Sequence, residues 1–391
     1  MSPSIKVERI WCVRSTVMTT AIAMGLLSGS LGCSGDRTAS PPQTMSILVG
    51  SEPTLVISGF SPAAEDAFGD PRGVRWLADG SVVCLDGSLK KIGVWDSTGV
   101  LRWAAGRKGS GPGEFQEPQI IGTVGADSIF VYDASLRRLS LWLVGRGLVS
   151  EWPAPQGVAG NVQPFGVIGG SVIARVLRFT MPAPPDRLVS SVATIIAWKL
   201  DQRRVDTLTT IPNGVNNVDG YRYYAWRSVA AVTDTSIIFG RGDSTTLHEI
   251  DLRGRELRSF GWEAPLRLVT DEERESIRRF GATSGALATQ IDDDDMADTV
   301  PQFGRLIRDP EGVVWIPAYE EVSKFTDTAV GINASGGTIG PFTLPQRFRA
   351  TFVRDSAVLG VLETEEGARV VASFTVQRRA VSAAGGQASK H

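Results

Sequence analysis

The chain has 391 residues, a formal net charge of −2, three cysteines and two histidines. A charge balance this close to neutral gives no support to nucleic-acid binding, which draws on concentrated positive charge. Three cysteines are also too few for a disulfide framework in a chain of this length.

Residues 1–32 predict an export signal. Lys6, Arg9 and Arg14 precede an uncharged stretch, residues 15–32, of mostly small and apolar residues, which is the composition of a signal peptide. Its apolar part, roughly 15 residues, is shorter than the roughly 20 that span a bilayer, so we expect cleavage. Because residues 1–32 hold three basic residues and one acidic residue, the rest of the chain carries −4.

The signal ends in Ser30-Leu31-Gly32-Cys33, which resembles a bacterial lipobox. The resemblance implies that Cys33 is lipidated and starts the mature protein. The membrane contact would then be this N-terminal lipid only, at the cell envelope, in the periplasm or at the outer membrane of a Gram-negative cell. Two alternatives stay open: a Cys33–Cys84 disulfide, and Cys84 as a small buried hydrophobic residue. We expect residues 33–50 to form a flexible tether.

A repeat starts at Phe68. The segments that begin at Phe68 and Phe115 align at a constant offset of 47 residues, with these coincidences: Phe68/Phe115, Pro71/Pro118, Ser81/Ser128, Asp86/Asp133, Leu89/Leu136 and Trp95/Trp142. Each segment holds short runs of β-forming residues, such as 81–85 and 91–95, separated by turn residues. These runs predict β-hairpins.

The strand opening recurs to give six units, with markers at Ser81, Ser128, Ser171, Ser236, Val313 and Ser356. The intervals between markers are 47, 43, 65, 77 and 43 residues. Several short strands in each of six units predict an all-β fold, a six-bladed β-propeller over residues 51–377. Because an open ring would expose a strand edge, we expect residues 55–58 to pair with the last blade. The Ala- and Gly-rich residues 378–391 predict a disordered tail.

Two intervals are longer than the repeat. In the third unit, the proline-rich residues 181–186 cannot hold a central strand, and residues 212–224, rich in Asn and Gly, predict a loop. After the fourth unit, Thr270-Asp271-Glu272-Glu273 is a capping box that opens a helical run to about Phe280. This predicts one short helical insertion between blades 4 and 5, serving as a lid or brace.

The stretch Gly106-Arg107-Lys108-Gly109-Ser110-Gly111-Pro112-Gly113-Glu114-Phe115, followed by Pro118 and by Ile129-Phe130-Val131-Tyr132-Asp133, resembles the NHL repeat. It is most similar to that of bacterial six-bladed propeller lipoproteins related to NHL proteins. The resemblance implies the propeller fold over most of residues 68–376. It implies no activity, since this family is largely uncharacterised and one fold hosts many functions.

Two groups of side chains are candidates for a ligand or partner surface. Arg107 and Lys108 lie in the Gly-rich loop, which a strand follows; a phosphate-binding loop would lead into a helix, so turn geometry explains the glycines. Arg222, Tyr223 and Tyr224 follow a long loop and could form a face for a glycan or peptide. Core packing is the favoured explanation for the tyrosines.

Catalytic and metal motifs are missing. His248 and His391 are too few for a Ser-His-Asp triad or a structural zinc site. The aspartates at 292–295 and Asp298 lack the alternating spacing and the glycine of a calcium loop, so a solvated charge run explains them. No cofactor is predicted.

These observations favour a non-enzymatic binding or scaffold propeller at the cell envelope, a monomer that holds a protein, peptide or glycan. The alternative is a hydrolase similar to the calcium-dependent six-bladed lactonases, acting on lactones or esters. In that case one Ca²⁺ in the central channel, held by Asp, Glu and Asn side chains, would activate water or polarise a carbonyl. The sequence does not single out individual residues as ligands of that metal.

Overall fold

The computed structural model describes residues 44–61, 67–180, 188–217, 222–283, 291–321, 326–354 and 356–381. The predicted signal peptide, Cys33, the proline-rich residues 181–186 and most of the predicted tail lie outside the described residues. One compact unit, Met45–Arg379, contains the sheets.

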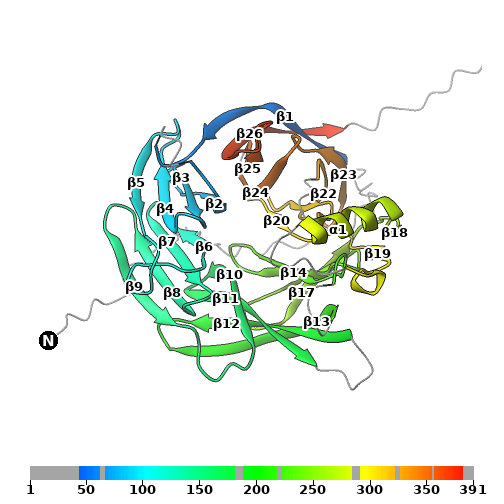
Figure 1. Cartoon of the computed structure of the whole chain (residues 1–391), viewed down its shortest axis with the longest axis horizontal. Helices are drawn as coiled ribbons and strands as arrows, with labels where there is room; N and C mark the ends of the chain where they lie inside the picture. Colours follow the sequence, from blue (N-terminus) through cyan, green and yellow to red (C-terminus); the bar gives the residue numbers. More distant parts are fainter. Residues whose placement is uncertain are drawn as a thin grey trace, which may run out of the picture. The chain divides into compact units, whose positions relative to one another are not determined.

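Six four-stranded sheets form the blades of a β-propeller (Figure 1). The first three blades each run from an inner to an outer strand: β2 (Pro71–Trp76), β3 (Val82–Asp86), β4 (Lys91–Trp95) and β5 (Leu101–Ala105); β6 (Pro118–Val124), β7 (Ser128–Asp133), β8 (Arg138–Leu143) and β9 (Gly147–Pro153); β10 (Asn161–Ile168), β11 (Ser171–Thr180), β12 (Leu188–Lys199) and β13 (Arg204–Asn217). Neighbouring strands within each of these blades are antiparallel.

The other three blades are β14 (Ser228–Val232), β15 (Ile237–Arg241), β16 (Thr246–Ile250) and β17 (Glu256–Gly261); β20 (Ile307–Arg308), β21 (Val314–Pro317), β22 (Thr328–Ile332) and β23 (Thr338–Thr343); and β24 (Phe348–Arg354), β25 (Ala357–Glu363), β26 (Arg369–Val381) and β1 (Thr44–Ile57). Between β17 and β20 in chain order come β18 (Arg267–Leu268), the helix α1 (Asp271–Thr283), a single 3-10 turn (Asp293–Asp295) and β19 (Thr299–Val300). The fold is an all-β six-bladed propeller with one α-helix among the described residues.

The second strand of each blade forms the core. All residues of β3 and of β7 are buried, because each blade packs against a neighbouring blade on both of its faces. A strand covered on both faces is a continuous apolar run rather than an alternating one. The outer strand β5 is partly exposed along its whole length, as expected of a sheet edge.

The repeated Asp86 and Asp133 have the same structural role. The side chain of Asp133 is buried and accepts backbone N–H groups from Gln116 at 2.7 Å, Glu117 at 3.1 Å and Leu136 at 2.9 Å. Asp86 does the same in the first blade, for Gly69, Asp70, Ser88 and Leu89. Each carboxylate therefore fixes the turn after its own strand to the segment that enters the blade.

The N-terminal strand is longer than predicted. β1 is the outer strand of the last blade, beside β26, and it includes the predicted residues 55–58. It begins at Thr44, inside the stretch predicted as a tether, because Met45, Ile47 and Val49 point into the core of the last blade while Leu48 stays exposed.

Two further boundaries are corrected. β26 continues to Val381, and Arg378, predicted as the start of a disordered tail, forms an ion pair of 2.7 Å with buried Asp309. The predicted loop at 212–224 is strand up to Asn217. Pro212 is tolerated there because β13 is an edge strand, whose outward N–H groups need no partner.

Replacing Asp133 by alanine should lower the free energy of unfolding by about 3 kcal/mol, because three buried or partly buried N–H groups would lose a charged acceptor. The shift of the urea midpoint measures this. Asp234→Ala is the control: its carboxyl is exposed in the β14–β15 turn and has no partner among the described residues. Equal midpoints for the two variants would contradict the assigned role of Asp133.

Candidate functional site

The two long insertions emerge on one face of the propeller. Each blade is a meander with an even number of strands, so every connection from an outer strand to the next inner strand lies on the same face. We call this the connection face. The β17–β20 connection, which accounts for the long interval after the fourth unit, lies on it. So do the end of β11, the start of β12 and the end of β13, and the lengths of these strands account for most of the long interval after the third unit.

The third blade extends beyond the others on this face. β11, β12 and β13 have 10, 12 and 14 residues, whereas β7 and β8 have 6 each. Leu188 at the start of β12 lies opposite Asn217 at the end of β13. The extension therefore presents these two side chains at its edge.

We call the described residues from β18 to β19, 267–283 and 291–300, the lid, which has its own core. Its helix starts at the predicted capping box, in which Glu273 N–H donates to Thr270 Oγ1 at 3.2 Å and Thr270 N–H donates to Glu273 Oε2 at 3.0 Å. Ile277 of α1 is buried in one cluster with these residues: Tyr224, Val269, Met296 and Val300. Local capping and this apolar contact hold α1 over the connection face.

The two insertions are joined to each other. Tyr223 N–H donates to Asp295 O at 2.8 Å, and Ala297 N–H donates to Tyr223 O at 2.9 Å. Asn217 Nδ2 donates to Asp295 Oδ1 at 2.5 Å, and Arg222 Nη2 donates to Met296 O at 3.3 Å. The end of the third blade and the lid therefore form one continuous structure.

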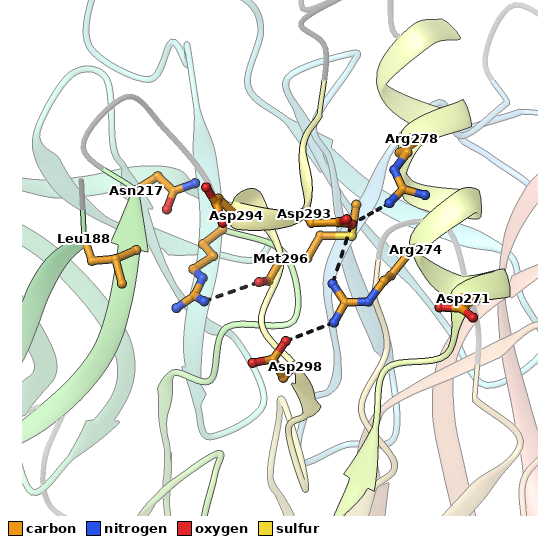
Figure 2. A pocket seen from close by; sticks show the side chains of 10 residues that line it. Leu188, Asn217, Asp271, Arg274, Arg278, Asp293, Asp294, Met296 and Asp298 are labelled. Carbon is orange, nitrogen blue, oxygen red and sulfur yellow. Dashed lines mark hydrogen bonds and ion pairs between the residues drawn. The ribbon is translucent and has the colours of Figure 1, made fainter. Parts of the chain in front are cut away.

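A cavity of about 670 Å³ lies where they meet, which we call the lid pocket (Figure 2). Three arginines and four aspartates, with Leu188, Asn217 and Met296, line it: Arg222, Arg274, Arg278, Asp271, Asp293, Asp294 and Asp298. Opposed charges and a small apolar wall suit a ligand that carries both charges and hydrogen-bonding groups.

Ion pairs order part of the lid pocket. Arg274 contacts Asp298 at 3.1 Å and Asp293 at 3.9 Å, and Arg278 contacts Asp293 at 2.5 Å (Figure 2). These pairs join α1 to the aspartate run. Residues 292–294 are exposed, as the predicted solvated charge run requires, and the run also supports the pocket wall through Asp293.

Two titrating groups behind the lid pocket are held in one charge state at neutral pH. The bidentate contact of Arg267 lowers the pKa of Glu273 to about 2, with help from Thr270. Burial raises the pKa of Tyr224 to about 12, and the carboxylates of Glu273 and Glu321 act in the same direction. The Tyr224 phenol is therefore neutral, and it serves as lid core, 3% exposed.

The predicted surface residues fall in separate places. Arg222 lines the lid pocket, whereas Tyr223 and Tyr224 pack behind it. Arg107 and Lys108 lie between the first and second blades, where Arg107 pairs with Glu114 at 2.8 Å. Glu114 also accepts the Gly111 N–H at 2.8 Å, so its carboxylate closes the Gly-rich turn.

Most lid-pocket residues were not predicted. The capping box at Thr270 and the aspartate run marked the segments, but no local pattern shows that Arg274 and Arg278 meet the aspartates.

Cys84 is a free, fully buried cysteine, and its burial raises the pKa of its thiol. This agrees with the alternative in which Cys84 is a small buried hydrophobic residue. The other cysteine of interest, Cys33, lies outside the described residues.

In the described part of the chain, no three or more His, Cys, Asp or Glu side chains are grouped so as to hold a metal ion. No helix in the same part combines the length and the apolar composition needed to cross a membrane.

No protein-family model matches this chain, and no curated protein does. Among solved structures, it is similar to a DUF4221 family member from Bacteroides vulgatus, with 10% identity, a TM-score of 0.56, and coverage of 86% of this chain and 99% of that chain. It is also similar to a Bacteroides fragilis protein classed provisionally as exported, with 11% identity, a TM-score of 0.50, and coverage of 85% and 95%. These similarities establish the propeller fold alone.

The lid should loosen in acid. A carboxyl whose pKa is lowered by folding stabilises the folded state above its unfolded pKa, about 4.5 for Glu273, and that contribution is lost as the pH falls towards about 2. We expect amide hydrogen exchange in α1, corrected for intrinsic rates, to speed up between about pH 5 and pH 3. In Glu273→Gln the exchange should be faster at pH 5 and change less with pH. An unchanged pH dependence in that variant would contradict the assignment.

Proposed function

We propose that the protein is a non-enzymatic binding propeller of the cell envelope, exported and lipid-anchored through Cys33, that holds a peptide segment in the lid pocket. The observation that carries the proposal is the joining of the two insertions around one charged cavity. The blades alone complete the ring, so the additional residues serve something other than closure. We further propose membership of the NHL-related propeller lipoproteins, on the motifs at residues 106–133.

The lining chemistry supports binding. The arginines offer forked N–H donors to carboxylates and backbone carbonyls, and Asp271 and Asp294 offer acceptors to N–H groups. A peptide supplies both kinds of partner.

The tyrosines argue for a peptide over a glycan. A sugar ring stacks on an exposed aromatic face, whereas Tyr224 is buried in the lid core and Tyr223 packs against the same cluster. The apolar surface left to a ligand is that of Leu188, which is 45% exposed, because Met296 is buried in the lid core. Leu188 suits an aliphatic side chain flanked by charged ones.

An array of mixed-charge peptides, read out by fluorescence polarisation on the purified protein, tests the proposal. Arg222→Gln and Arg278→Gln should each weaken the best peptide by at least tenfold, because a hydrogen bond to a charged group contributes about 1.5–3 kcal/mol. Arg253→Gln, an exposed arginine in the β16–β17 turn on the opposite face, should leave the affinity unchanged.

Failure to bind any peptide, or equal loss in all three variants, would contradict peptide binding in the lid pocket. The hydrolase alternative has its own readout, since a metal that binds only the folded state raises the thermal midpoint. A rise in millimolar calcium that EDTA reverses, together with hydrolysis of a lactone, would replace the binding proposal with that alternative.

A further inference from the structure

A second cavity lies at the junction of the first and last blades. Its volume is about 670 Å³, and it is distinct from the lid pocket in all of its lining residues: Asp70, Pro71, Arg72, Gly73, Arg349, Thr351, Val361, Glu363 and Arg369. We call it the junction pocket. It opens where β2, β24 and β26 begin, which places it on the connection face.

Three arginines from both ends of the chain converge on the junction pocket. Arg72 is in β2, Arg349 in β24 and Arg369 at the start of β26. Thr351 Oγ1 donates to Val74 O at 3.1 Å, and Arg354 Nη1 donates to Leu77 O at 3.0 Å. These bonds between the last and first blades fix the backbones that carry the arginines.

The carboxylates around the junction pocket are shared. Asp70 is in contact with Arg72 and lies 3.9 Å from Arg369. Glu320 accepts from Arg305 at 2.9 Å and from Arg349 at 3.0 Å. Each of these carboxylates therefore lies beside two guanidinium groups, and its single negative charge cannot neutralise both positive charges.

A third carboxylate lines the junction pocket, that of Glu363. Glu363 stands opposite Arg369 in the β25–β26 pairing, but no ion pair of 4 Å or less joins them among the described residues. The side chains of Arg72 and Arg369 are 43% and 48% exposed. Both therefore present N–H donors to a ligand.

Arg75 adds a positive charge on β2. It is two residues from Gly73, its guanidinium is 5.8 Å from the ring centre of Phe352, and its Nη2 donates to Ile121 O at 3.5 Å. Burial lowers its pKa to about 10, so it remains protonated at neutral pH. Arg75 does not line the junction pocket, so it contributes only to the positive field around it.

We infer that the junction pocket binds a small oxyanion, phosphate or carboxylate, through the guanidinium groups of Arg72, Arg349 and Arg369. The planar fork of arginine matches the geometry of both anions and can bind them in a bidentate manner. This site does not depend on the proposed peptide binding. An anion held there bridges the first blade and the last, so it should also stabilise ring closure.

Calorimetric titration of the purified full chain tests the inference. Inorganic phosphate, citrate and acetate are titrated separately at constant ionic strength, so that general screening stays the same. We expect saturable binding of phosphate or of citrate, and the stronger of the two identifies the source of the oxyanion. Arg369→Gln should weaken that binding at least tenfold, and Arg253→Gln, which removes a charge on the opposite face, should not.

The thermal midpoint gives a second readout. The binding anion should raise the midpoint of the wild type and of Arg253→Gln, and raise that of Arg369→Gln much less. Should Arg369→Gln unfold, Arg72→Gln replaces it, since Arg72 is also exposed. Absence of saturable binding for all three anions, or equal weakening in the control, would overturn the inference.

Discussion

The propeller depends on the pairing of strands from its two ends. β1, near the start of the chain, is the outer strand of the blade whose other three strands come last. Without it, the last blade would keep three strands, and β26 would become its unpaired outer edge. Arg378 of β26 adds a buried ion pair to Asp309, which also accepts the indole N–H of Trp315 at 3.0 Å. Arg378 also pairs with Glu311 at 3.0 Å, so it is the removal of Arg378 that would leave a buried charge, that of Asp309, without its cation.

A closed ring supplies a rigid platform for loops of very different lengths. The buried second strands and the turn-fixing aspartates Asp86 and Asp133 hold each blade, so a long connection does not disturb its neighbours. This explains how the third blade can extend and how the lid can be inserted while the repeat continues on both sides. Both pockets lie on the face where such connections gather, which is where binding residues are expected on a rigid scaffold.

Local chemistry made much of the fold predictable. Serine and aspartate at the turns, and the capping box at Thr270, act within a few residues, so the sequence shows them directly. The blades, the helix start and the closing strand at residues 55–58 follow from such signals. The beginning of β1 was missed because its partner strand is distant: Ser46 Oγ donates to Arg379 O across 333 residues of sequence.

The pockets could not be predicted for the same reason. Asn217 meets Asp295 across 78 residues, and Arg222 meets Met296 across 74. Such pairings depend on the register of the extended third blade and on the path of the lid, which no local motif specifies. Arg222 was predicted from its neighbouring aromatics, but those tyrosines proved to be packing residues. The junction pocket needs the ring to close before its arginines meet.

The joined insertions are the proposed binding surface of the propeller. Hydrogen–deuterium exchange on the full chain, with and without the tightest peptide from the array, locates the bound peptide. We expect slower exchange at residues 222–224, in α1 and at residues 293–298, with no change in the turns of the opposite face. Slower exchange on that opposite face, with none in the lid, would rule out the joined insertions as the peptide site.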